Sequence, residues 1–213
     1  MNKNILFCAI AILLLLPGLT LAGDFVCKTV DNISARGGIL IAPARNDGVN
    51  RLYLGGGWCL FEYTWQDSVW LKDTVESDLM KVPEAIAAGF GRNDGVLRLY
   101  GGHNGLALYE YSYEGGLWST VLIDGVREVG RTVAVGDIKN DDTMRVVAGG
   151  DDGVTMAYTY QSGSNTWLAE TLGVNTNVIQ GVAIGKGRND DTNRVYSGGG
   201  NTILRPLQKA YIV

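Results

Sequence analysis

The chain has 213 residues and a formal net charge of −4 at pH 7. Of its residues, 46% are hydrophobic and 19% are charged. This mildly acidic balance, without a cluster of Lys and Arg, speaks against nucleic acid as a partner. His103 is the only histidine, so a histidine metal cluster is excluded, and the glycine runs lack the Lys-Ser/Thr ending of a phosphate loop. We therefore expect neither an enzyme nor a cofactor.

Residues 1–22 are predicted to be a signal peptide. Lys3 supplies the charged start, 5–16 form an apolar run, and Thr20-Leu21-Ala22 offers a small-residue cleavage site. The apolar run is shorter than the roughly 20 residues of a membrane-spanning helix. We expect cleavage before Gly23, secretion or export to the periplasm, and no membrane span afterwards. A retained N-terminal anchor is the alternative.

Cysteine usage gives a second expectation for an exported chain. Cys8 leaves with the leader, whereas Cys27 and Cys59 remain. An even pair in an oxidising compartment permits one disulfide, so we predict that these two cysteines are bonded. Two buried free thiols are equally compatible with the sequence.

Residues 23–213 are predicted to form a single domain built from one motif that occurs four times. Its first copy reads Ala-Arg-Asn-Asp-Gly-Val-Asn-Arg-Leu-Tyr. The copies begin at Ala44, Gly91, Ile138 and Gly187, which are 47, 47 and 49 residues apart. A fixed period of this size indicates one supersecondary unit that packs against its own copies. The repeats lie near 37–84, 85–131, 132–180 and 181–213.

Each repeat is expected to contain antiparallel strands. Short runs rich in Val, Leu, Tyr and Trp alternate with Gly/Asn/Asp clusters, and no helical period is sustained outside the leader. In the third copy we predict strands at 132–136, 145–149, 154–160 and 166–172. Four strands in about 45 residues is the size of a propeller blade. The fold class is therefore all-β, with about four propeller blades.

The chain ends suggest how such a ring could close. The last copy has a predicted third strand near 202–207 but lacks the Trp-bearing fourth strand. Residues 25–30 resemble that missing strand, so we predict that they complete the last blade and remove its exposed edge. A fragment of a larger propeller, or self-association into one, is the alternative.

The first turn of each repeat places an Asp four residues before an Arg. This turn resembles the calcium loop of FG-GAP (integrin-type) propeller repeats, where oxygen ligands fall at alternate positions. Lys139 and Arg145 stand where ligands would be expected, and a hard cation needs about six to eight oxygens. We therefore predict no metal. Instead, Asp47, Asp94, Asp141 and Asp190 are expected to pair with these arginines and to cap the turns.

The later part of each repeat resembles a different family. The segments 98–100, 108–113 and 115–118 are similar to the repeat of the fungal and bacterial fucose-binding lectins, which are also propellers. The resemblance implies that an Arg and a Glu bind one sugar while an aromatic ring covers its apolar face. The candidate ligand-binding residues are Arg51, Glu62 and Trp70 in the first copy, and Arg98, Glu110 and Trp118 in the second.

These sites number at most two, because Ala157 and Pro206 replace the Glu in the later copies. An ordinary cross-strand ion pair is the alternative for each Arg/Glu pair. The three recurring tryptophans are expected first of all to pack between neighbouring blades. Trp58 breaks the repeat pattern, because it stands in a glycine-rich turn, where an aromatic ring is a better ligand platform than in a core strand. The alternative is that Trp58 simply covers Cys59.

The sequence thus predicts an exported, non-catalytic binding module. Its leading candidate ligand is a glycan. The alternative is an extracytoplasmic scaffold that binds a cell-surface protein through its variable loops. A hydrolase using Asp151 and Asp152 is least favoured, because neighbouring residues on a strand point to opposite faces. The lectin interpretation needs Arg51 and Arg98 to point into an open pocket, whereas the scaffold interpretation needs them to fold back onto Asp47 and Asp94.

Overall fold

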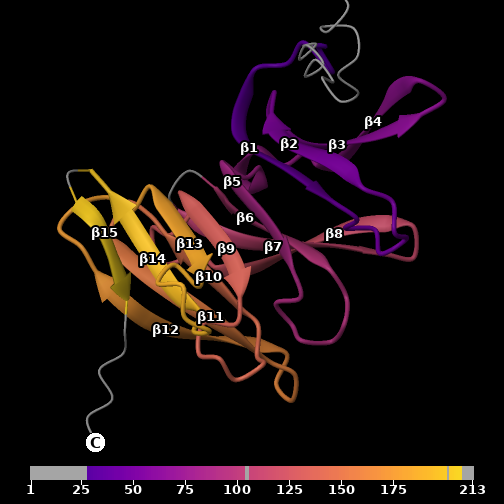
Figure 1. The fold of residues 1–213 in the computed structure, drawn as a ribbon. Coiled ribbons are helices and arrows are strands. Elements are labelled where there is room, and N and C mark those ends of the chain that lie inside the picture. The colour runs from indigo at the N-terminus through magenta and orange to yellow at the C-terminus, as the bar shows by residue number, and fades with distance from the viewer. Residues whose placement is uncertain (1–27, 104–105, 201, 208–213) are drawn as a thin grey trace, which may run out of the picture. The chain divides into compact units, whose positions relative to one another are not determined.

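The described part of the chain forms fifteen strands, arranged in four antiparallel sheets. The computed structural model describes residues 28–103, 106–200 and 202–207. Figure 1 shows the strands coloured along the chain, and within each sheet they follow one another in chain order. Three sheets have four strands and the last has three. We number them sheet 1 to sheet 4.

The sheets correspond to the four sequence repeats. Sheet 1 comprises β1 (Ala35–Ala42), β2 (Arg51–Gly56), β3 (Cys59–Gln66) and β4 (Val69–Glu76), and is followed by the short 3-10 helix η1 (Leu79–Lys81). Sheet 2 comprises β5 (Ala85–Gly89), β6 (Arg98–His103), β7 (Ala107–Glu114) and β8 (Leu117–Asp124). Sheet 3 comprises β9 (Thr132–Gly136), β10 (Arg145–Gly149), β11 (Val154–Gln161) and β12 (Thr166–Val174). Sheet 4 comprises β13 (Gly181–Gly185), β14 (Arg194–Gly199) and β15 (Thr202–Leu207).

The strands predicted for the third repeat are confirmed. Their starts agree with β9 to β12, and only the ends of β11 and β12 extend further, by one and two residues. Tight turns explain the regular spacing. Gly115 and Gly116 have φ values of 59° and 88° and join β7 to β8 as a two-residue hairpin, which is the conformation that glycine adopts most easily.

The apolar core lies between successive sheets. The first strands contact one another in order, β1 with β5, β5 with β9 and β9 with β13. Between sheets 1 and 2, Tyr53 and Leu60 pack with Leu99 and Tyr111. Equivalent positions fill the boundary between sheets 2 and 3, and a smaller cluster fills the one between sheets 3 and 4. Each sheet therefore buries one face against the next, as a blade does.

Closure by the N-terminal segment stays a prediction. Of the predicted strand 25–30, Lys28, Thr29 and Val30 belong to no strand, and 25–27 lie outside the described residues. The predicted signal peptide also lies outside them. In the described part of the chain, no helix is long and apolar enough to cross a membrane.

The predicted disulfide between Cys27 and Cys59 also stays a prediction. Cys59 is a half-buried free thiol at the start of β3, and Cys27 lies outside the described residues.

Candidate functional site

The turn after the first strand of every sheet has the same internal structure. Each turn contains an Asn with left-handed backbone, followed by an Asp whose carboxylate meets the guanidinium of the Arg four residues later. The N···O distances are 2.7 Å for Arg51–Asp47, 2.8 Å for Arg98–Asp94, 2.7 Å for Arg145–Asp141 and 2.6 Å for Arg194–Asp190. The predicted pairing is therefore present in all four turns.

The Asp carboxylate also caps its own turn. Asp47 Oδ1 accepts a hydrogen bond from the backbone N–H of Val49 at 3.0 Å, and the other three aspartates do the same. The hydrogen bond from Arg51 lowers the pKa of Asp47 to about 2. The same cause lowers the pKa of Asp94, Asp141 and Asp190. These carboxylates are held ionised as parts of the turn.

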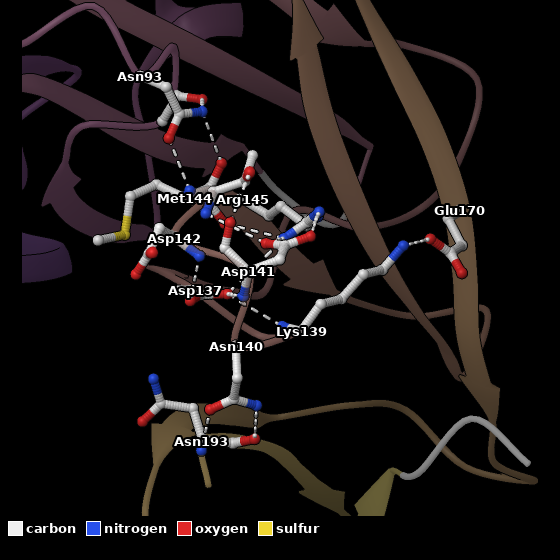
Figure 2. A network of polar contacts seen from close by, with 12 residues as sticks. Asn93, Asp137, Lys139, Asn140, Asp141, Asp142, Met144, Arg145, Glu170 and Asn193 are labelled. Carbon is white, nitrogen blue, oxygen red and sulfur yellow. Dashed lines mark hydrogen bonds and ion pairs between the residues drawn. The ribbon is translucent and has the colours of Figure 1, made fainter. Parts of the chain in front are cut away.

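The third turn shows this arrangement most fully (Figure 2). Asp137 accepts hydrogen bonds from the backbone N–H groups of Lys139, Asp141 and Asp142. Arg145 donates two hydrogen bonds to Asp141, at 2.8 and 2.7 Å. The carboxylates of Asp137 and Asp141 are thus engaged by backbone amides and a guanidinium. Among the described residues, no group of three or more His, Cys, Asp or Glu is arranged to hold a metal ion.

The two candidate glutamates are completely buried at the boundaries between sheets. Glu62 on β3 and Glu110 on β7 have no exposed surface. Their closest cationic partners are Arg45, at 2.6 Å from Glu62, and Arg92, at 2.6 Å from Glu110. Arg51 and Arg98, the partners expected from the sequence, are farther away, with Nε at 3.5 and 3.7 Å. The structure therefore places two arginines around each glutamate, and the nearer one is the one that the sequence analysis missed.

A buried tyrosine also contributes to the site in sheet 1. The hydroxyl of Tyr53 donates a hydrogen bond to Glu62 Oε2 at 2.9 Å. Burial, together with the negative charge of Glu62, raises the pKa of Tyr53 well above its usual value. The hydroxyl therefore stays protonated and remains a donor.

Arg45 and Arg92 also join one sheet to the next. The guanidinium of Arg45 lies 4.4 Å from the ring centre of Tyr113 in sheet 2, and that of Arg92 lies 4.5 Å from Tyr160 in sheet 3. Each arginine thus pairs with a buried carboxylate in its own sheet and stacks on an aromatic ring of the following sheet. In the third repeat, Lys139 pairs with Glu170 at 2.7 Å instead.

The candidate tryptophans lie in different surroundings. Trp118 packs edge-on against Tyr53 of sheet 1, at 5.9 Å between ring centres, as expected for packing between sheets. Trp167 packs in the same way against Tyr100. Trp70 instead lies against Trp65 of its own sheet, at 5.1 Å. The structure therefore does not give Trp70 and Trp118 the same environment.

Two polar pockets lie beside these residues. One, of about 330 Å³, is lined by Arg51 and Glu62 together with Arg45, Thr64, Gln66 and Asp73. The other, of about 570 Å³, includes Arg92, Ser112, Tyr160 and Trp167. Arg98, Glu110 and Trp118 do not line it. Of the six candidate residues, Arg51 and Glu62 line the first of these two pockets, and none lines the second.

An apolar pocket of about 250 Å³ opens where η1 and the β2–β3 turn meet. It is lined by Trp58, Leu79, Met80 and Pro83, with the backbone of several glycines. Trp58 is 57% exposed and has a φ of 73°, a left-handed conformation that is rare for an aromatic residue. His103 lines the same pocket, and its Nδ1 lies 2.7 Å from the carbonyl oxygen of Val82. The sequence indicated Trp58 but gave no sign of Leu79 or Met80.

The remaining acidic candidates have structural contacts. Asp151 pairs with Arg131, and Asp152 accepts a hydrogen bond from the N–H of Val154 at 2.8 Å. These contacts assign the two side chains separate partners.

Comparisons with known proteins bear on the fold. No protein-family model and no curated protein matches the chain. Among solved structures, the chain is similar to BBS1N, a β-propeller, in the crystal structure of BBS1N in complex with ARL6DN, soaked with lead. The TM-score is 0.54 and the sequence identity 15%, over 80% of this chain and 52% of that chain. This chain thus spans about half the length of the solved chain that it matches.

That likeness shows a propeller-type fold. The number of blades in a closed ring, and the resemblances to FG-GAP repeats and to fucose-binding lectins, stay predictions.

Proposed function

We propose that the chain is an exported, non-catalytic binding module that recognises an apolar segment of a protein partner. The observation that carries the proposal is Trp58, an exposed aromatic residue in a strained turn beside an apolar pocket. Left-handed backbone in a non-glycine residue costs on the order of 1–3 kcal/mol, and such strain gathers at functional sites. A two-residue hairpin of this kind favours Asn-Gly or Gly, so a tryptophan there opposes stability.

The chemistry of this pocket suits a hydrophobic side chain. Leu79 and Met80 are 46% and 57% exposed, and a flexible methionine adapts to varied apolar partners. BBS1N, which this chain resembles in fold, is in complex with a protein in its crystal structure, which agrees with a protein partner.

The internally paired arginines also support the protein-binding alternative over the glycan. Arg51 and Arg98 fold back onto Asp47 and Asp94, which is the arrangement that the scaffold interpretation requires. Both glutamates are buried and ion-paired within the chain. A sugar would have to displace these partners before it could bind them.

The test uses a displayed library of random peptides against the purified chain and its Trp58→Gly variant. Glycine removes the ring and relieves the left-handed backbone, so we expect the variant to be as stable as the parent or more stable, by about 1 kcal/mol. Peptides with aromatic or aliphatic residues should be enriched on the parent, with at least about tenfold weaker binding to Trp58→Gly. Leu117→Ser, at an exposed residue of another hairpin, is the matched control and should bind like the parent. Failure to enrich such peptides, or equal binding to both chains, would overturn the proposal.

A glycan is the second candidate, favoured by the polar pocket of Arg51, Glu62 and Thr64. Gln66 also lines this pocket and is exposed, so its replacement should leave folding intact. If this candidate holds, a glycan array should show binding to the parent chain that is at least about tenfold weaker with Gln66→Ala. An array without binding, or binding unaffected by this change, would contradict it.

A further inference from the structure

Every boundary between sheets within the chain uses the same positions. The first strand of a sheet presents two residues to the preceding sheet, namely Ile86 and Ala88 in β5, Val133 and Val135 in β9, and Val182 and Ile184 in β13. All six belong to the apolar clusters between sheets. We call the surface that a sheet presents to the preceding one its leading face, and the opposite surface its trailing face.

Sheet 1 has the same leading face, but the described residues cover it less than they cover the leading faces of the other sheets. Ile39 and Ile41 occupy the two corresponding positions in β1 and are 68% and 69% exposed. In the next strand, Leu52 is only half-buried, whereas Leu99 and Val146 at this position are completely buried. Sheet 1 therefore displays an apolar surface that the other sheets bury.

The aromatic residue of the leading face is exposed in sheet 1 as well. Tyr113 and Tyr160 receive the guanidinium groups of Arg45 and Arg92 from the preceding sheet. The corresponding residue of sheet 1 is Trp65, which is 55% exposed. Trp65 is thus at the position where an arginine of a preceding sheet would stack.

At each boundary, an Asn side chain also forms a pair of hydrogen bonds with the backbone of the following sheet's turn. The side chain of Asn93 accepts from the N–H of Met144 at 2.7 Å and donates to its carbonyl oxygen at 3.0 Å. Asn46 binds Leu97 in the same way, and Asn140 binds Asn193. Figure 2 shows two of these connections on either side of the third turn. An Asn in the turn of one sheet is thus hydrogen-bonded, through its side chain, to the turn of the following sheet.

The trailing face of sheet 4 carries the complementary groups. Arg188 corresponds to Arg45 and Arg92. Asn189 corresponds to the three asparagines that form these hydrogen bonds. Both side chains are exposed, and Asn189 keeps the left-handed backbone of its counterparts, with a φ of 56°. In sheet 1, the residue that corresponds to its hydrogen-bonding partner is Asn50.

We propose that the leading face of sheet 1 binds the trailing face of sheet 4 of a second copy of the chain. One chain carries both halves of a boundary that it already forms three times, so the second copy needs no new type of contact. The exposure of Ile39 and Ile41 shows that sheet 4 of the same chain does not cover them. The chain also spans about half the length of the solved chain that it resembles, which agrees with a second copy supplying further blades.

Two copies related by a two-fold axis would form both junctions at once. Each junction joins unlike faces, and a two-fold arrangement closes the ring after two copies, so no leading face stays exposed. Arg188 of one copy stacks on Trp65 of the other, and Ile39 and Ile41 become buried.

The mass of the purified chain in solution tests this proposal by analytical ultracentrifugation at micromolar concentrations. We expect twice the mass of one chain. In Ile39→Glu/Ile41→Glu, the new charges stand on an exposed face, so folding is retained while the dissociation constant rises at least about 100-fold. Leu117→Glu adds a charge at an exposed residue elsewhere and should remain dimeric. Circular dichroism should show the same strand content in all three chains.

A mixing experiment distinguishes unlike faces from like ones. Arg188→Glu/Asn189→Ala impairs only the trailing face and should also be monomeric. Mixed with the leading-face variant, it should restore dimers, because each mixed pair keeps one intact junction. A monomeric parent, a dimer that survives the leading-face change, a mass above two copies, or a mixture that stays monomeric would overturn the proposal.

Discussion

Replacing Glu110 by Gln should lower the free energy of unfolding by about 3 kcal/mol. The carboxylate is completely buried and lies 2.6 Å from Arg92, whose side chain is 18% exposed, and 3.7 Å from Arg98. Removing one partner of a buried ion pair costs about 3–5 kcal/mol, because the remaining charge is left uncompensated. Gln keeps the volume and one acceptor oxygen, so the loss should fall at the lower end. In a chain of this length, about 3 kcal/mol corresponds to a fall in Tm of about 6–12 °C.

Urea unfolding followed by circular dichroism measures this loss directly. Glu114→Gln is the matched control, because this glutamate lies on the same strand, is 69% exposed, and is 3.7 Å from Arg98. We expect its effect to stay below about 0.5 kcal/mol, as for an exposed ion pair. A loss below about 1 kcal/mol in Glu110→Gln, comparable with the control, would refute the structural role assigned to the buried carboxylate.

Three further results are expected. Asn93→Gly keeps the left-handed backbone but loses both hydrogen bonds to Met144. The free energy of unfolding, measured by urea titration, should therefore fall by about 1–2 kcal/mol. No change would contradict the role of these hydrogen bonds between sheets. Gly102→Ala places a Cβ 2.3 Å from the carbonyl oxygen of Gly130, so it should destabilise by more than about 2 kcal/mol, whereas Gly163→Ala, in open space, should stay within about 0.5 kcal/mol. Because the folded pKa of Asp47 is about 2, below the unfolded value of about 3.9, its stabilisation is present above about pH 4 and is lost as pH falls towards 2. Urea midpoints across this range should fall, and less steeply in Asp47→Asn; an identical slope would contradict this.

The strands and turns could be predicted from the sequence because their determinants are local. Alternating apolar residues and turn-forming glycines set the bounds of β9 to β12. The pairing of Asp141 with Arg145 was predictable for the same reason, since the two residues are four positions apart in one turn.

The partners of the buried glutamates could not be predicted in this way. Arg45 reaches Glu62 from 17 residues away, and the register between strands, rather than the local pattern, decides which arginine is closer. The hydrogen bond from Asn46 to Leu97 joins residues 51 positions apart in two different sheets. The sequence shows that Asn46 recurs in every turn and that Arg45 recurs in all but the third, where Lys139 stands. A repeat pattern, however, does not tell contacts within a sheet from contacts between sheets.

Trp58 was recognised as an exception to the repeat, although its pocket was not. Leu79 and Met80 belong to a connection between sheets that has no counterpart in the repeat motif. Their arrival beside Trp58 depends on how η1 packs, which is a tertiary property.

A double-mutant cycle on Arg51 and Asp47 tests the central claim most directly, namely that the recurring arginines serve the fold. Two hydrogen bonds, at 2.8 and 2.7 Å, join these side chains. Unfolding of the parent, Arg51→Met, Asp47→Asn and the double variant in urea gives the coupling energy between them. We expect at least about 1 kcal/mol, as for a charge-assisted pair with one largely buried partner. A coupling energy near zero would mean that Arg51 is free to turn towards a ligand, and would contradict the claim.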